Sequence, residues 1–85
     1  MEGESVEHVR LTSPDIDGAG DRDRIEREVS ALEGVLNVTV QPNEHCALID
    51  FDPRIVNVNR IEERLQDAGY HVSARQFASP RDNPE

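Results

Sequence analysis

The chain has 85 residues, of which 35% are hydrophobic and none is tryptophan, so it suits one small domain with a modest core. Its 18 acidic residues outnumber 9 basic residues, all of them arginine, and give a net charge of -9. Because acids interleave with the arginine clusters, nucleic acid and anionic membrane surfaces are poor partners.

The first half of the chain predicts a strand, a loop and a helix. Residues 6–12 alternate between polar and apolar side chains, which is the period of a half-buried strand. Residues 13–20 contain one proline, two glycines and two aspartates, and this combination predicts an irregular loop. Apolar residues then recur at helical spacing, so we expect a helix that begins near Asp21 and stops at Gly34.

The second half predicts a hairpin, a second helix and a last strand. Residues 35–40 and 46–51 are alternating segments on either side of a proline-containing turn, and this arrangement predicts a β-hairpin. Asn57 is a good N-cap for the next helix, and Gly69 supplies its stop. We expect the last strand to begin at Tyr70.

This order of elements predicts the fold class. Strand, helix, strand, strand, helix, strand indicates an α+β, ferredoxin-like βαββαβ sandwich with a four-stranded antiparallel sheet and two helices on one face. We place the domain at residues 6–76. The low apolar content of residues 1–5 and 77–85 predicts disordered tails on both sides.

Three landmarks at characteristic spacing carry a resemblance to a known family. They are Ser30–Val35 at the end of the first helix, Phe51–Pro53 after a strand, and Ala68–Tyr70 at the end of the second helix. Together they resemble the heavy-metal-associated domain family, to which copper chaperones belong. The resemblance implies a ferredoxin-like fold with strand order 4-1-3-2.

The same resemblance locates the segment that binds metal in the family, a Met-x-Cys-x-x-Cys loop before the first helix. It places Ile16 at the Met position, Gly18 at the first Cys and Asp21 at the second. In the family an aromatic or cationic residue at the position of Tyr70 packs over this loop, but here we expect Tyr70 to cap the core, with its hydroxyl toward water. Soft ions such as Cu(I) prefer sulfur ligands, so we expect this loop to be inactive toward them and no cofactor to be bound.

Two other groups of residues offer metal ligands. Asp15, Asp17, Asp21 and Asp23 supply hard oxygens for a weakly bound divalent cation, although their spacing does not fit an EF-hand. A solvated acidic loop explains the same residues.

The second group would lie on the open face of the sheet. We expect His8 and Cys46 to lie on neighbouring parallel strands and to face the same way, as Zn²⁺ or Cu²⁺ ligands would, with His71 toward the opposite end of the sheet from Cys46. Partly exposed strand residues without a joint role are the alternative.

The acidic first helix suggests a function. In metallochaperone-like proteins this face docks onto transporters, so we expect a partner with a basic surface, such as a metal transporter, to meet Asp21, Asp23, Glu26 and Glu28. We therefore predict a small soluble interaction or regulatory module in metal homeostasis that has lost its soft-metal cysteine pair. The alternatives are a metal-ion-binding protein and a small-ligand sensor, either as a monomer or as a sheet-mediated dimer.

Composition and motifs also bear on catalysis and compartment. The chain shows no catalytic motif, and the acids beside Gly18 and Arg22 repel the anion that an acyl-phosphate hydrolase would hold, so we predict no enzymatic activity. A single cysteine and the absence of a membrane span of roughly 18 residues predict a cytoplasmic protein. Acidic excess without lysine is typical of halophilic proteins, and a GC-rich genome would also replace lysine by arginine.

Overall fold

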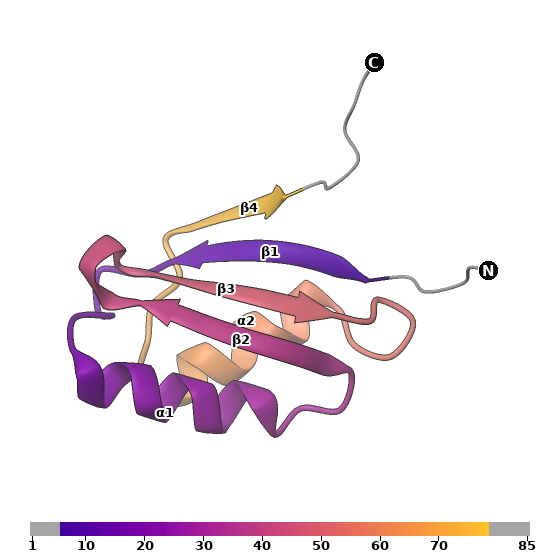
Figure 1. Ribbon diagram of the computed structural model, residues 1–85, viewed down its shortest axis with the longest axis horizontal. Coiled ribbons are helices and arrows are strands. Elements are labelled where there is room, and N and C mark those ends of the chain that lie inside the picture. The colour runs from indigo at the N-terminus through magenta and orange to yellow at the C-terminus, as the bar shows by residue number, and fades with distance from the viewer. Residues whose placement is uncertain (1–5, 79–85) are drawn as a thin grey trace, which may run out of the picture.

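A computed structural model describes residues 6–78 of the chain and shows a two-layer α+β sandwich (Figure 1). The sheet forms one layer and both helices form the other, which confirms the predicted ferredoxin-like fold. The elements in chain order are β1 (Glu7–Thr12), α1 (Ala19–Ser30), β2 (Val35–Gln41), the 3₁₀ turn η1 (Pro42–Glu44), β3 (Cys46–Phe51), α2 (Val58–Asp67) and β4 (Ala74–Ala78).

The sheet has the strand order β2-β3-β1-β4, and every neighbouring pair is antiparallel. This order is the predicted one read from the other edge. The centre of the sheet is the β1–β3 pair, in which Val9 lies opposite Ile49 and Leu11 opposite Ala47. Alternation then directs these four side chains to the same face, where the helices cover them.

The core lies between that face and the helices. Ile25 and Val29 from α1 and Ile61 and Leu65 from α2 are fully buried, and they pack against the inward residues of the sheet. Each aliphatic side chain removed from water in this way contributes about 1.5–3 kcal/mol. Their spacing of four residues on each helix is what turns one apolar stripe toward the sheet.

Both ends of α2 have well-defined caps. The side chain of Asn57 accepts a hydrogen bond from the backbone N–H of Arg60, as predicted for an N-cap. At the other end Gly69 adopts a positive φ of 101°, and the N–H of Tyr70 donates to the carbonyl of Leu65 at 2.9 Å. These two features form a Schellman motif, which fixes where Tyr70 leaves the helix.

Several element boundaries differ from the sequence-based expectation. Helix α1 ends at Ser30, and Gly34, which was expected to stop it, lies in the turn before β2. Helix α1 begins at Ala19 rather than near Asp21, because the first helical N–H groups need no intrahelical partner and Gly20 is therefore tolerated there. Strand β4 begins at Ala74 rather than at Tyr70 and continues to Ala78, beyond the expected limit at residue 76. The helix-ending turn at Gly69 keeps Tyr70 out of the sheet ladder.

Of the tails predicted at residues 1–5 and 77–85, residues 77–78 belong instead to β4, and residues 1–5 and 79–85 lie outside the described residues. Within residues 6–78, neither helix is long and apolar enough to cross a membrane.

Gly34 is the glycine with the tightest surroundings, and it generates a first prediction. Its φ is 99°, and a Cβ there would lie 2.8 Å from Val56 Cγ1 and 2.9 Å from Ile55 Cβ. Gly34→Ala should therefore destabilise the fold by about 2 kcal/mol or more, since backbone strain and overlap add. Urea unfolding followed by circular dichroism measures the loss.

Gly69→Ala is the matched control. Gly69 has nearly the same φ, 101°, and a Cβ added there would meet no atom within 4 Å, so this variant should show the backbone strain alone, about 1 kcal/mol. Equal losses of stability for the two variants would contradict the inference that residues 55–56 pack too closely against Gly34 to admit a Cβ.

Candidate functional site

The candidate site is the loop between β1 and α1, at the end of the sandwich where α1 begins (Figure 1). Ile16 is fully buried in the core, and its packing there holds the loop against the domain. Gly18 is the N-cap of α1 in an extended conformation without a side-chain cap, and its carbonyl accepts from the N–H of Arg22 at 3.1 Å. The loop therefore passes directly into the helix N-terminus, where an anionic group is stabilised.

The carboxylate of Asp21 occupies that position. One oxygen accepts from the hydroxyl of Tyr70 at 2.7 Å, and the other accepts from the backbone N–H of Asp17 at 2.9 Å. The Tyr70 hydroxyl, followed by the backbone N–H groups of Asp17 and Gly18, lowers the pKa of Asp21 from its ordinary value. Asp21 is thus an anion held by donors from both sides of the loop.

Tyr70 reaches Asp21 because the Schellman motif at the end of α2 directs it there. Its residue exposure is only 4%, and burial, followed by the hydrogen bond to Asp21, raises the pKa of Tyr70 above its ordinary value. Tyr70 therefore belongs to the core, as expected, and its hydroxyl also reaches the loop. The expectation that its hydroxyl points to water is wrong, because the hydroxyl donates its hydrogen bond to Asp21.

Three further contacts fix the loop, and they come from residues to which no sequence pattern gave this role. The Nδ1 atom of His45 lies 2.7 Å from the carbonyl oxygen of Ile16. The N–H of the buried Ser13 donates to the carbonyl of His45 at 2.8 Å, and the N–H of His71 donates to a carboxylate oxygen of Asp15 at 2.9 Å. His45 has a positive φ of 56°, which is uncommon for a residue other than glycine. No sequence pattern indicated this conformation.

The acidic loop has no geometric support as a cation site. In the part of the chain that the structure describes, no three His, Cys, Asp or Glu side chains come together as metal ligands would. Asp15 and Asp21 instead accept hydrogen bonds from N–H and O–H groups of the protein. Asp17 and Asp23 are exposed.

The expected arrangement of His8 and Cys46 is wrong. β1 and β3 are antiparallel, so His8 lies opposite Asp50 while Cys46 lies opposite Thr12, at the other end of both strands. His8 Nδ1 contacts Asp50 Oδ1 at 2.5 Å instead, and Cys46 is fully buried. These two residues therefore do not form a joint site.

The position expected for His71 is also wrong. β4 begins with Ala74 opposite Thr12, and Thr12 lies opposite Cys46. The segment that carries His71 therefore enters the sheet at the end where Cys46 lies, because β4 runs antiparallel to β1.

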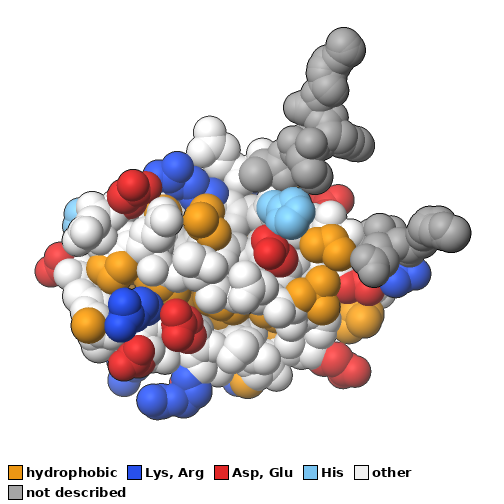
Figure 2. Space-filling view, in the orientation of Figure 1, with side chains coloured by type: hydrophobic (Ala, Val, Ile, Leu, Met, Phe, Trp, Pro, Cys, Tyr) orange, Lys and Arg blue, Asp and Glu red, His pale blue; other side chains and the backbone are white. Residues whose placement is uncertain are grey.

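The four acidic residues expected to dock a partner differ in their contacts. Asp21 is engaged in the loop, and Glu28 lies 3.6 Å from Arg64 of α2. Asp23 is exposed and lies 3.9 Å from Arg22, and Glu26 is half-buried. Figure 2 shows acidic and basic side chains side by side near the start of α1, so the surface there carries mixed charge with an acidic excess.

The architecture and the loop together define the class of protein. Two helices on one face of an antiparallel sheet of this order form a ferredoxin-like domain, with a loop at the start of α1 closed by the end of α2. The sequence model of the heavy-metal-associated domain family matches residues 10–71. The chain belongs to the heavy-metal-associated domain family.

The curated relatives that match this chain include copper-exporting P-type ATPases. Copper-exporting P-type ATPases of Staphylococcus aureus strains Newman and COL are 30% identical to this chain over 73 residues, or 86% of it. The match spans only 9% of the length of these curated relatives.

Solved structures agree on the fold. A putative copper-ion-binding protein from Bacillus anthracis str. Ames is 27% identical, with a TM-score of 0.78 over 84% of this chain and 100% of that one. Oxidized MerP from Ralstonia metallidurans CH34 is 26% identical, with a TM-score of 0.76 over 81% of this chain and 96% of that one.

The Asp21–Tyr70 bond generates a prediction about pH. Since the folded state lowers the pKa of Asp21, its ionised form stabilises the fold above its unfolded-state pKa, about 3.9, and this stabilisation is lost as pH falls through the lower folded-state pKa. Asp21→Asn should therefore be less stable than the parent chain at pH 7, and the difference should shrink below about pH 4. Urea unfolding at pH 7 and pH 3 measures both differences.

Asp17→Asn is the control, because Asp17 enters the loop contacts through its backbone N–H. It should leave stability at both pH values close to that of the parent chain. A loss at pH 7 as large as that of Asp21→Asn would mean that loop charge in general, rather than the bond to Tyr70, is responsible.

Proposed function

We propose that this heavy-metal-associated domain has lost soft-metal binding and acts as a protein-interaction or regulatory module in metal homeostasis, in the cytoplasm. The observation that carries the proposal is the bond of the Asp21 carboxylate to Tyr70 at 2.7 Å, since the family resemblance assigns Asp21 to the second cysteine position. In a pair of metal-binding thiolates, the second sulfur would have to occupy the position of this carboxylate.

The donor chemistry of the loop does not fit a soft ion. Gly18 has no side chain to offer, and Asp21 supplies oxygen rather than sulfur, whereas Cu(I) prefers thiolate and thioether ligands. The one cysteine, Cys46, is fully buried in β3, with its Sγ 3.7 Å from Gln41 Oε1. No residue of the loop therefore replaces the missing sulfur.

The partner is inferred from charge and from the relatives. Copper-exporting ATPases contain a matching segment, which supports a transporter of metal ions as the partner class. The excess of acid at Asp15, Asp17, Asp23 and Glu26 favours a basic surface on that partner, since complementary charge speeds association. Binding of this kind needs no metal in the loop.

The first test concerns Cu(I). In competition with a tight Cu(I) chelator under reducing conditions, the protein should retain no copper, because two thiolates are needed where Gly18 and Asp21 stand. Copper measured per chain after gel filtration gives the answer. One retained Cu(I) per chain would refute the proposal, and Cys46→Ser would show whether the buried thiol held it.

The positive control restores the cysteines. Gly18→Cys combined with Asp21→Cys should bind Cu(I), because a Cβ added at Gly18 meets no atom within 4 Å and the helix N-terminus favours thiolates. If this variant folds but binds no copper, the loop lacks the backbone geometry of a metal site, and the residue types alone do not explain the loss.

The second test concerns docking. Asp23→Arg with Glu26→Arg should slow association with a transporter partner by about tenfold at low salt, since long-range attraction sets the rate. Asp21 is left intact because reversing its charge would also break the loop. Stopped-flow or surface-plasmon measurements at two salt concentrations give the rate constants.

Glu63→Arg with Asp67→Arg is the matched reversal on α2, where both residues are exposed. It should slow association less than the α1 reversal does. If both reversals act equally, the attraction is a property of the net charge, and the proposed docking surface is wrong.

A further inference from the structure

A second surface lies at the opposite end of α1 from the metal-type loop. With 12 residues in the helix, the two ends are about 18 Å apart. Two exposed aliphatic side chains mark this end, Leu36 with 58% and Ile55 with 57% relative exposure. Figure 2 shows hydrophobic side chains gathered at the end of the molecule where β2 begins and β3 ends.

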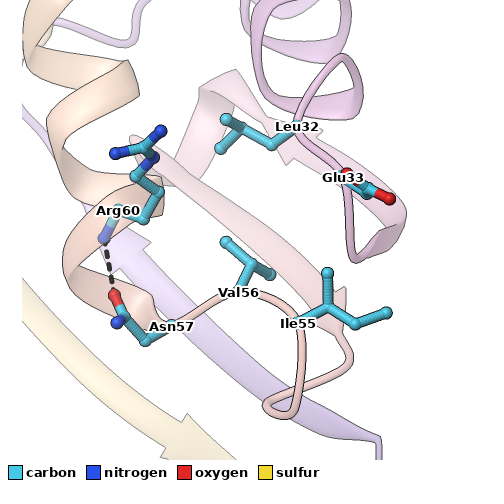
Figure 3. A pocket seen from close by; sticks show the side chains of 6 residues that line it. All are labelled: Leu32, Glu33, Ile55, Val56, Asn57 and Arg60. Atoms are coloured by element: carbon cyan, nitrogen blue, oxygen red, sulfur yellow. Dashed lines mark hydrogen bonds between the residues drawn. The ribbon is translucent and has the colours of Figure 1, made fainter.

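A groove of about 350 Å³ opens beside Ile55. Figure 3 shows its walls, with Leu32, two residues after the end of α1, facing Val56 and Ile55 across the opening, and Arg60 of α2 extending toward Leu32. A second hollow of about 210 Å³ shares Leu32 and Arg60 and is also lined by Glu63, Arg64 and Asp67 of α2. We call the two hollows together the α1–α2 furrow.

The walls of the furrow are held in place by the fold itself. The N–H of Asp52 donates to the carbonyl of Gly34 at 2.8 Å, and the carbonyl of Asp52 accepts from the N–H groups of Ile55 and Val56. Ile55 and Val56 pack so closely against Gly34 that a Cβ at this position would overlap them. A preformed surface of this kind costs little ordering entropy when a partner binds.

The charges around the furrow are available to a partner. Among residues 6–78, the side chains of Glu33, Arg60, Glu63 and Asp67 form no ion pair. Three of these four are acids. Arg64, which also lines the second hollow, is paired with Glu28 at 3.6 Å, so the unpaired charges of the rim favour basic groups. Arg60, which borders both hollows, has donors suited to the backbone carbonyls of a bound segment.

We propose that the α1–α2 furrow is a docking site for a peptide segment of a partner protein in which an aliphatic side chain lies between basic residues. The aliphatic side chain packs on Leu32, Ile55 and Val56, and the basic residues face the acidic rim. This surface is independent of the loop at Asp21, so the domain engages a second partner, or a second part of the same one.

The test uses an amidated and acetylated peptide with the order Lys-Gly-Leu-Gly-Lys. Titration into the full chain, followed by ¹H–¹⁵N NMR, should shift the amides of Leu32, Ile55, Val56 and Arg60 and leave those of the loop at Asp21 in place. Replacing the leucine of the peptide by serine, or both lysines by glutamate, should weaken binding by about tenfold or more.

Ile55→Ser and Leu36→Ser form a matched pair, since both side chains are more than half exposed and only Ile55 lines the groove. Ile55→Ser should weaken binding of the peptide by about tenfold, and Leu36→Ser by less than about twofold. Shifts spread over all acidic surfaces, equal effects of the two variants, or no saturation up to about 10 mM peptide would each overturn the proposal.

Discussion

Coverage of one sheet face by two helices is the constraint on which the rest of this structure depends. The central strands β1 and β3 supply inward residues at every second position, and the helices bury them with Ile25, Val29, Ile61 and Leu65. A shift of one residue in either strand would turn polar side chains inward, so the register is strongly determined. The ends of the helices, where both candidate surfaces lie, are positioned by this packing.

The face of the sheet that no helix covers contains polar and charged side chains. His8 contacts Asp50, and Arg10 lies 3.4 Å from Glu44, but partly exposed pairs of this kind contribute only about 0–1 kcal/mol. Stability therefore comes from the helix side.

The loop at α1 depends on both helices at once. α1 supplies Asp21 in its first turn, and α2 supplies Tyr70 through the turn at Gly69. The resulting bond joins residues 49 positions apart in the chain. The carboxylate of Asp21 and the hydroxyl of Tyr70 thereby join the start of α1 to the end of α2, and this bond helps to fix the conformation of the loop.

The sequence predicted the features that rest on local patterns. Alternation identified the strands, Asn57 and Gly69 identified the ends of α2, and the family landmarks gave the strand order. Features that depend on contacts between distant residues were missed. The bond of Tyr70 to Asp21 is one. The burial of Cys46 was also missed, although its thiol lies beside Gln41, five positions earlier on the neighbouring strand.

The wrong placement of His8 relative to Cys46 had a different cause. His8 and Cys46 were placed together because their side chains alternate in the same sense, but alternation fixes the face of a sheet and says nothing of the position along it. The antiparallel register separates them. The early start of α1 was missed because glycine carries no side chain that could signal a cap at Gly18.

The contact between His45 and Ile16 fixes the tautomer of the histidine ring. A carbonyl oxygen can only accept, so the Nδ1 atom of His45, 2.7 Å from that oxygen, must carry a hydrogen. In the neutral ring the Nε2 atom, on the far side, is then the acceptor. His45 thus joins the turn before β3 to a loop residue 29 positions earlier in the chain through a donor that the carbonyl group itself selects.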